Sequence, residues 1–329
     1  MGQQGPRPFV TNPVAKGGGF MPTVLAILTS GRPSGFTSEL LEAAVEGVEE
    51  FGGVDVELVH THAYRFGPCT SCFECIRNPD AGCVLNDDMG GSGDLFAKLG
   101  AANGIIIADP VHNWGISASA RLLVERCYPF TWTGQLKGVP AMSISCASNQ
   151  GMHLLARREL CKYLFGMRAL YIGGVAAHVA QFDSAIGSAH AMGLSLADAA
   201  LHDTPEAREA WTDQEAFEHY ARTAPWDPVE ACIENLLGPE MDPSDTLMDA
   251  ALRDGVIKRR DAVAEVRKAQ AGFAETLRLR DAGEHDEAAR AMARATAHWT
   301  RATWIEFLED DVIGVKQPPA YRPTEEDGD

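Results

Sequence analysis

Five short apolar runs, separated by helix-like stretches, constrain the fold of this chain more than any other feature. The runs are rich in β-branched residues, and the first, third and fifth are largely apolar, as expected for parallel strands buried on both faces. They are Thr23–Leu28, Val54–Val59, Gly104–Ala108, Val139–Ser145 and Leu170–Val175. Strand–helix alternation at this spacing predicts a three-layer α/β fold around a parallel sheet.

The stretches between the runs have helical periodicity. Ser38–Glu50 places apolar residues at a spacing near 3.6 and is followed by two glycines, which favour a helix end. Ser117–Arg126 and Gly151–Phe165 show similar patterns. We therefore expect a helix after the first, third and fourth strands.

The second half of the chain has a different character. Residues 183–313 are rich in Ala, Glu, Arg and Leu and contain no convincing strand, so we expect a helical extension that serves as a lid or an oligomer interface. Within it, Ser244–Asp281 predicts one long helix, interrupted or bent near Gly255 and Gly272, and Glu284–Asp310 predicts its antiparallel partner. Residues 1–20 are expected to be a flexible tail, and residues 314–329 a disordered acidic tail.

Charge and hydropathy argue against several classes of protein. The formal net charge of −18 argues against nonspecific binding to nucleic acid or to an anionic membrane, because both would repel the chain. No apolar run approaches the roughly 18–20 residues needed to span a bilayer, and the first twenty residues lack the apolar core of a signal peptide. We therefore expect a cytoplasmic protein that does not bind membranes, in a compartment where structural disulfides are rare.

Four of the eight cysteines fall within fifteen positions. Cys69, Cys72, Cys75 and Cys83 have the spacing C-x2-C-x2-C-x7-C, and the residues around them favour turns. Thiolates at this spacing can wrap a [4Fe–4S] cluster, whereas zinc sites usually pair two separated C-x2-C knuckles. Zinc and unligated thiols remain as alternatives, whereas a redox disulfide would leave two of the four thiols without a role. The other cysteines are interpreted as small buried residues: Cys127, Cys146, Cys161 and Cys232.

Three polar loops follow the first, third and fourth predicted strands. They are "TSGRPSGFTSELL" at 29–41, "DPVHNWGISASARLLVER" at 109–126 and "SCASNQGMH" at 145–153. Ligands of open α/β sheets bind beyond the carboxyl ends of the strands, so these loops are expected to converge on one crevice. Backbone N–H groups at a helix start, hydroxyls and a tryptophan suit a flat aromatic cofactor that carries a phosphate. The first loop is also compatible with a plain polar turn in which Thr37 or Ser38 caps the helix.

These loops, together with the cysteine stretch and the "NDDM" that follows it, resemble the flavodoxin-like NAD(P)H-dependent FMN reductases, and within them the iron–sulfur flavoproteins. The resemblance covers about residues 22–175. It implies a flavodoxin-like three-layer sandwich in residues 21–182, with a five-stranded parallel sheet, FMN at its carboxyl edge and a cluster loop at 67–84. It also implies a homodimer or homotetramer.

The resemblance carries over to particular residues. It places the phosphate loop at Ser30, Arg32, Ser34, Gly35 and Thr37. It places the segment along the isoalloxazine edge at Pro110, Val111, His112, Asn113 and Trp114, with Ser117 opening the next helix. The third loop matches in position and polarity and offers Ser145, Ser148, Asn149 and Gly151. Two departures are Phe36, where the family commonly has Asn, and the order His-Asn-Trp-Gly at 112–115.

The sequence therefore predicts an FMN-dependent oxidoreductase with a [4Fe–4S] cluster that reduces a small organic substrate, with NAD(P)H or ferredoxin as the electron donor. His112 and His153 are its candidate proton donors, because histidine titrates near neutral pH. Two alternatives remain. One is an electron carrier that passes electrons to a redox protein, and the other is an FMN or quinone reductase without a cluster.

Overall fold

The computed structural model describes residues 21–149, 151–310, 312–318 and 321–322, which fall into two compact units. The first unit contains the described residues up to 71, residues 83–130 and residues 135–210. The second contains residues 72–82, residues 131–134 and the described residues from 211 onward. The flexible tail expected at residues 1–20 lies outside the described residues.

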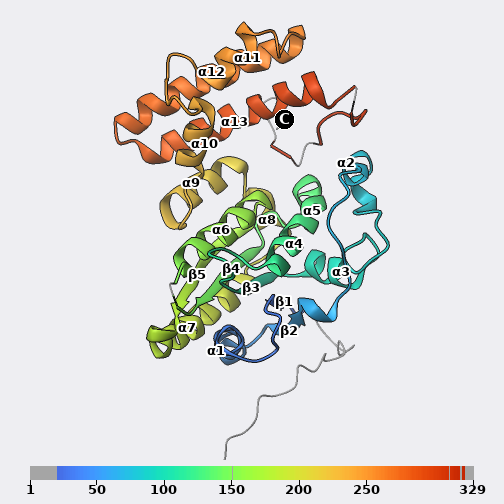
Figure 1. Ribbon diagram of the computed structural model, residues 1–329, viewed down its shortest axis with the longest axis vertical. Helices are drawn as coiled ribbons and strands as arrows, with labels where there is room; N and C mark the ends of the chain where they lie inside the picture. Colours follow the sequence, from blue (N-terminus) through green and yellow to red (C-terminus); the bar gives the residue numbers. More distant parts are fainter. Residues whose placement is uncertain (1–20, 150, 311, 319–320, 323–329) are drawn as a thin grey trace, which may run out of the picture. The chain divides into compact units, whose positions relative to one another are not determined.

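The first unit is built on one parallel sheet of five strands in the order β2-β1-β3-β4-β5, which is the flavodoxin-like order (Figure 1). The fold class expected from the sequence is therefore confirmed. Three strands extend two or three residues beyond their expected carboxyl ends, toward the loops. The strands are β1 (Thr23–Leu28), β2 (Asp55–His60), β3 (Gly104–Pro110), β4 (Pro140–Ala147) and β5 (Leu170–His178).

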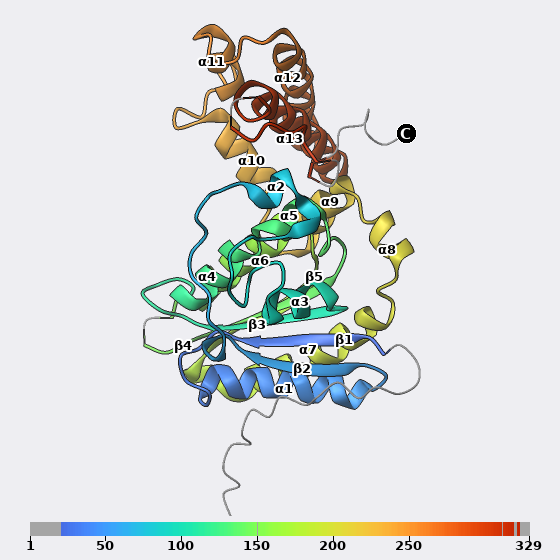
Figure 2. The same ribbon diagram turned by 90° about the vertical axis from the view of Figure 1, so that its right-hand side faces the viewer.

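Helices cover both faces of this sheet. Helices α1 and α7 lie against one face, and α3, α4 and α6 cover the other (Figure 2). The bounds in this unit are α1 (Phe36–Phe51), α3 (Asp94–Ala101), α4 (Ala118–Arg126), α6 (His153–Gly166), α7 (Phe182–Leu201) and α8 (Pro205–Ala210), with short 3-10 turns at Thr61–Ala63 and Val179–Gln181. Helix α5 (Tyr128–Thr133) spans the boundary between the units.

Helices α1 and α7 approach each other closely because each has a glycine at the contact. A Cβ atom at Gly47 would lie 2.1 Å from the carbonyl oxygen of His190, and one at Gly193 would lie 1.9 Å from that of Ala44. Both distances are far below contact distance, so no larger residue fits. Because α7 packs here, the first unit continues to Ala210. From the sequence, we expected this domain to end at residue 182.

The second unit is helical. Its bounds are α2 (Glu74–Arg77), α9 (Asp213–Thr223), α10 (Pro228–Leu237), α11 (Leu247–Arg253), α12 (Arg260–Asp281) and α13 (His285–Phe307), with a 3-10 turn at Pro79–Ala81. The expected long helix is interrupted at Gly255, which has φ +66°, but it runs through Gly272 without a break. A Cβ at Gly272 would lie 3.1 Å from that of Ala295, so this glycine serves the packing of α12 on α13. The antiparallel pair α12–α13 is as expected.

The disordered tail expected from residue 314 is corrected where the chain is described. Trp304 donates its indole N–H to the carbonyl of Val315 at 3.0 Å, and Gln317 donates to the carbonyl of Tyr321 at 2.7 Å. The Tyr321 ring lies 4.0 Å, between centroids, from the ring of Trp132 within the same unit. The proline-rich composition suggested disorder, but aromatic contacts hold this segment. The acidic residues 323–329 lie outside the described residues.

None of the helices in the described ranges combines the length and the apolar character needed to cross a membrane.

Candidate functional site

The first candidate element is the loop between β1 and α1. Helix α1 begins at Phe36 and its N-cap is Gly35, so neither Thr37 nor Ser38 caps it as the plain polar turn required. Gly35 has φ +130° and ψ −177°, a conformation that is essentially restricted to glycine, and a Cβ there would meet no atom within 4 Å. The helix start therefore faces open space with no side-chain cap, which is the geometry of an anion site.

The side chains of this loop differ in their exposure to solvent. Ser30 and Thr37 are buried, and Arg32 and Ser34 are exposed. The Ser30 hydroxyl accepts a hydrogen bond from the backbone N–H of Arg32 at 3.1 Å, which tightens the turn. The exposed Phe36 ring packs edge-on against Phe182 of α7, with the ring centroids 4.9 Å apart.

A buried carboxylate joins this loop to the end of β3. Asp109 is fully buried and accepts hydrogen bonds from the hydroxyls of Thr29 and Ser117 and from the backbone N–H of Ser117 at 2.9 Å. Burial raises the pKa of Asp109, and the bonds from Ser117 and Thr29 partly offset that rise. Ser117 also caps α4, since its hydroxyl accepts from the N–H of Ala120. Asp109 was not singled out in the sequence, although a lone Asp at the end of an apolar strand is a usable signal.

The β3 loop presents its aromatic residue at the tip of a tight turn. His112 and Gly115 exchange backbone hydrogen bonds of 3.0 and 3.1 Å, and the two residues between them, Asn113 and Trp114, have positive φ. This turn leaves Trp114 62% exposed, and His112 is exposed beside it. Such an indole can contact a flat ring bound above the sheet edge.

The β4 loop completes the edge. Asp109 and Ser145 are register partners on adjacent strands, so these two loops start side by side. The buried Ser145 donates to the carbonyl of His153 at 2.6 Å, whereas Ser148 and Asn149 are exposed. Cys146 is also buried here, and burial raises the pKa of its thiol, while a hydrogen bond with Thr37 of the first loop lowers it.

His153 has an unsatisfied nitrogen at this edge. Its Nδ1 is buried and has no hydrogen-bond partner in the described parts of the chain. A Cβ at Gly151, which has φ +90°, would lie 3.3 Å from that atom. Burial lowers the pKa of His153, and the neighbouring His178 and Arg157 lower it further. An uncapped helix start, an exposed indole and an unsatisfied nitrogen on loops of one sheet edge fit a bound FMN.

Two histidines that the sequence did not single out adjoin the loop between β1 and α1. His60 donates through Nε2 to the carbonyl of Ser30 at 2.6 Å. A Cβ at Gly31 would lie 3.6 Å from His62, whose Nε2 is 2.9 Å from the hydroxyl of Ser119. His60 is the last residue of β2, and His62 lies two residues beyond it. Nothing in the sequence indicates that either imidazole contacts the first loop.

The cysteine stretch is divided between the two units. Cys69 and Cys83 belong to the first unit, and Cys72 and Cys75 belong to the second. Cys75 is buried, Cys72 is exposed and the other two cysteines are half-buried. Across residues 21–149, 151–310, 312–318 and 321–322, no three His, Cys, Asp or Glu side chains are grouped so as to hold a metal ion.

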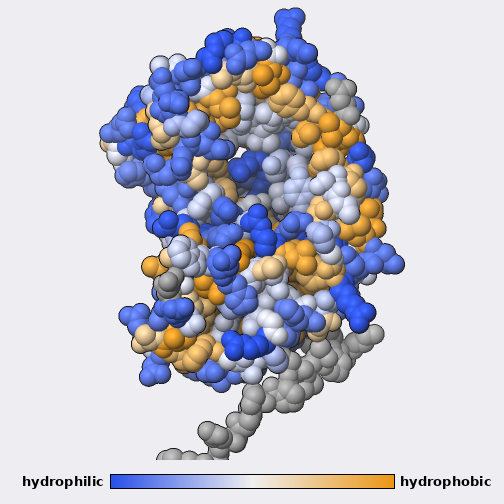
Figure 3. Space-filling model, viewed as in Figure 1, coloured by the Kyte–Doolittle hydropathy of each residue, from blue (hydrophilic) through white to orange (hydrophobic). Residues whose placement is uncertain are grey.

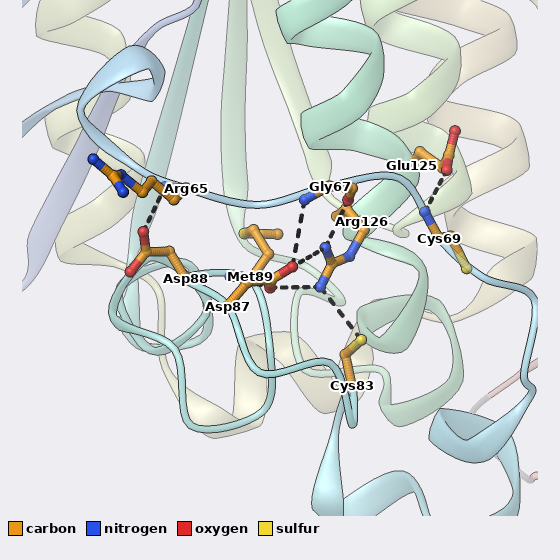
Figure 4. Close-up of polar contacts among 9 residues, drawn as sticks. All are labelled: Arg65, Gly67, Cys69, Cys83, Asp87, Asp88, Met89, Glu125 and Arg126. Carbon is orange, nitrogen blue, oxygen red and sulfur yellow. Dashed lines mark hydrogen bonds and ion pairs between the residues drawn. The ribbon is translucent and has the colours of Figure 1, made fainter.

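The ends of this stretch are nevertheless anchored in the first unit (Figure 4). The backbone N–H of Cys69 donates to the carboxylate of Glu125 at 2.7 Å. The sulfur of Cys69 accepts from the N–H of Ser71 at 3.4 Å. The sulfur of Cys83 accepts from the guanidinium of Arg126 at 3.4 Å. Sulfurs that accept N–H bonds suit thiolates, so the donor chemistry fits a thiolate-bound metal group.

The remaining cysteines fit the buried interpretation. Cys127, Cys146 and Cys161 are buried and Cys232 is half-buried. Burial raises the pKa of the Cys127 thiol to about 12 and also raises that of Cys232, so both stay protonated at neutral pH.

Part of this chain is similar in sequence to known flavoproteins. Residues 22–183 match the family described as NADPH-dependent FMN reductase. The chain is 31% identical over 114 residues to an iron–sulfur flavoprotein of Archaeoglobus fulgidus, covering 35% of this chain and 49% of that protein. It is 28% identical over 130 residues to an iron–sulfur flavoprotein of Methanocaldococcus jannaschii, covering 39% and 64%. The chain thus spans less than two thirds of the length of either relative.

Solved structures show weaker likeness. The chain is similar to RosB with a bound riboflavin-phosphate intermediate, with a TM-score of 0.42, 19% identity and coverage of 61% of this chain and 86% of that one. It is also similar to an NAD(P)H:quinone oxidoreductase from Methanothermobacter marburgensis, with a TM-score of 0.40, 17% identity and coverage of 54% and 100%. Residues 22–183 of this chain thus match the NADPH-dependent FMN reductase family, and the chain is similar to the iron–sulfur flavoproteins.

Proposed function

We propose that this chain is an FMN-dependent oxidoreductase that also carries a [4Fe–4S] cluster and reduces a small organic substrate. The observation that carries the proposal is the edge of the sheet, where an uncapped helix start, an exposed tryptophan and an unsatisfied histidine nitrogen meet in a domain of the FMN reductase family. When bound, the flavin exchanges electrons in pairs or singly and the cluster exchanges them singly, so together they join two-electron to one-electron chemistry.

The loop after β1 would hold the FMN phosphate. The backbone N–H groups at the start of α1 and the hydroxyls of Ser30, Ser34 and Thr37 would donate to it, and Arg32 would supply a positive charge. Gly35 leaves the space in which the phosphate would approach the backbone, since no atom lies within 4 Å of its missing Cβ. The field of the helix start favours an anion at this point.

The loops after β3 and β4 would hold the ring. The turn formed by residues 110–115 would bring Trp114 and the backbone of Asn113 to one edge of the isoalloxazine. Ser145, Ser148, Asn149 and Gly151 would line the other side. Asp109 would keep the first two loops in register, because it accepts hydrogen bonds from both of them.

His153 and His112 would handle protons. His153 has a lowered pKa and is therefore neutral at pH 7, so its free Nδ1 can accept or donate one hydrogen bond to the flavin without adding a charge. His112 is exposed beside Trp114, where it can exchange protons with solvent and with a substrate stacked at the turn.

Cys69, Cys72, Cys75 and Cys83 would ligate the cluster. The spacing supports this assignment, as do the N–H bonds to the sulfurs of Cys69 and Cys83 and the similarity to proteins named iron–sulfur flavoproteins. The outlying Cys83 would close the site, and Arg126 gives it a cationic neighbour suited to a thiolate.

The second unit would serve as a lid or as an oligomer interface. It exposes several large apolar side chains: Leu247, Val256, Phe307 and Val312. Figure 3 shows apolar residues among hydrophilic ones on the face that it draws. We propose a cytoplasmic homodimer or homotetramer that receives electrons from NAD(P)H or ferredoxin. Sedimentation at several protein concentrations checks the assembly, and a purely monomeric chain would contradict it.

One observation favours a second candidate, a cluster-free FMN or quinone reductase. In the described part of the chain, no three side chains of the types His, Cys, Asp and Glu lie together so that they could hold a metal ion. Under this candidate the cysteines would be idle thiols. The other alternative is an electron carrier without an organic substrate. It would be favoured if the protein reduced candidate organic substrates no faster than a simple dye.

Anaerobic purification, followed by an absorbance spectrum and by assays of flavin, iron and sulfide, separates these candidates. The proposal predicts one FMN and about four irons per chain. Flavin without iron after anaerobic reconstitution would support the cluster-free reductase, and absence of flavin would contradict all three candidates.

A further inference from the structure

Arg126, the last residue of α4, carries a buried positive charge beside the cysteine stretch. Its side chain is only 1% exposed. One terminal nitrogen donates to the carbonyl of Gly67 and to the carboxylate of Asp87, both at 2.7 Å. The other donates to the second oxygen of Asp87 at 2.8 Å and to the sulfur of Cys83 at 3.4 Å (Figure 4).

The direction of the guanidinium is fixed from both sides. The two carboxylate oxygens of Asp87 accept from the two terminal nitrogens of Arg126. This bidentate geometry holds the planar guanidinium in one orientation. Asp87 is itself held, because its carboxylate accepts from the N–H groups of Met89 at 3.1 Å and Gly67 at 3.4 Å. The hydrogen bonds from Arg126 also lower the pKa of Asp87, which keeps the pair ionised.

A purely structural ion pair would not require the last of these contacts. Asp87 already neutralises the arginine, and the carbonyl of Gly67 satisfies a further N–H. The fourth terminal N–H donates to the sulfur of Cys83. Sulfur is a poor acceptor as a neutral thiol and a good one as a thiolate. The arrangement therefore suits a sulfur that carries negative charge.

We propose that Arg126 is a positioning residue that sets the reduction potential of the metal group held by Cys83. This inference rests on the proposed function, because it requires the cluster. Reduction adds an electron to the cluster, and a fixed N–H bond from a cation to a ligand sulfur stabilises the added charge. Arg126 would thus raise the potential of the cluster, and Asp87 would moderate that effect.

Opposite charge changes on the two partners distinguish this role from a structural one. Arg126→Gln removes the positive charge and should shift the equilibrium toward the oxidised cluster on the order of tenfold, which is about 59 mV for one electron. Asp87→Asn removes the negative charge and should shift it the other way. A residue that only supports the fold would give shifts of the same sign, or none, as the loop loosens.

The measurement is a redox titration of the whole protein, with the cluster followed by electron paramagnetic resonance and the flavin by absorbance. Arg121→Gln is the matched control, since it makes the same charge change on the same helix with an exposed side chain. We expect the flavin potential to stay constant in all variants, and the cluster potential to move down in Arg126→Gln, up in Asp87→Asn and not at all in the control. Unchanged potentials, or shifts of one sign in both variants, would overturn the inference.

Removal of a buried charge can also prevent folding, and flavin content reports this. If Arg126→Gln loses its flavin, Arg126→Lys replaces it, because lysine keeps the charge but cannot make the two-pronged contact. It should lower the cluster potential by less, and a wild-type potential in Arg126→Lys together with an unshifted Asp87→Asn would overturn the inference. A wild-type protein with flavin but no cluster after reconstitution would instead contradict the proposed function, and the inference with it.

Discussion

The edge of the sheet and the cysteine stretch both follow strands of the same domain, but they are assembled in different ways. At the edge, strand register places the loops, and the buried carboxylate of Asp109 ties the first loop to the second. The cysteine stretch is built from side chains on a loop, anchored at Cys69 by Glu125 and at Cys83 by Arg126, with Cys72 and Cys75 in another compact unit. Folding thus places the loops of the sheet edge, whereas no three side chains of the types His, Cys, Asp and Glu are grouped to hold a metal in the described residues.

The largest expected effect separates the two regions outright. Cys83→Ala removes the outlying thiol and should cost the cluster, so that iron falls from about four atoms per chain toward none while the flavin stays bound. Iron, sulfide and flavin assays on anaerobically prepared protein check this. Cys232→Ala is the control, because that half-buried thiol lies outside the stretch. A full [4Fe–4S] centre in Cys83→Ala would refute the four-thiol assignment.

A smaller effect is expected at the phosphate loop. Gly35→Ala forces a side chain into a glycine-only conformation, which costs about 1–3 kcal/mol, and it also places a methyl group where the phosphate would lie. FMN affinity should fall at least tenfold, measured by titration of the apoprotein with FMN while flavin fluorescence is followed.

Gly52→Ala is the matched control for that variant. Gly52 caps the other end of α1 with φ +79°, and its Cβ would also enter open space, so the strain is similar but the site is distant. Its stability should fall while FMN affinity stays unchanged. Equal losses of FMN affinity in both variants would mean that α1 acts only through the fold.

A third test loosens the tie between the loops. Asp109→Ala leaves the hydroxyls of Thr29 and Ser117 and one backbone N–H without their buried acceptor, which should lower the free energy of unfolding by about 1–3 kcal/mol. FMN affinity should fall with it, because the first two loops lose their common anchor. Urea unfolding of the apoprotein gives the first quantity. If stability falls but FMN binds normally, the anchor is not part of the site.

The smallest effect concerns pH. The pKa of Asp109 is raised in the folded state, so its stabilising contribution is present below the unfolded pKa of about 3.9 and is lost as pH rises through the folded pKa. Asp109→Asn removes this loss and should flatten the decline in unfolding free energy with rising pH. Urea unfolding at a series of pH values checks the slope, and identical slopes in the two proteins would contradict the assignment.

The sequence was sufficient for the sheet because strand and helix periods are local properties. All five strands were anticipated, and the errors lie at their carboxyl ends, where β3 and β4 continue into polar residues such as Asp109. The unbroken helix at Gly272 was missed because its reason is a contact with Ala295, which no local pattern reveals. The order in the segment after residue 314 was missed for the same reason.

The residues of the candidate site also fall into those that the sequence could indicate and those that it could not. Loop residues on the sheet edge could be named in advance, because topology alone brings the ends of parallel strands together. The roles of His60, His62 and Arg126 could not, since each depends on a partner far along the chain; Arg126 and Asp87 are 39 positions apart. The Gly35 cap was missed because the hydroxyls of Thr37 and Ser38 are stronger cap signals than a glycine.

The claim that one chain holds a two-electron and a one-electron centre is tested most directly by counting electrons. Anaerobic titration of the reconstituted protein with a strong reductant, followed by absorbance, should consume three electron equivalents per chain, two for the flavin and one for the cluster. Cys83→Ala should consume two. A wild-type protein that is fully reduced by two electrons, with no iron signal, would contradict the account.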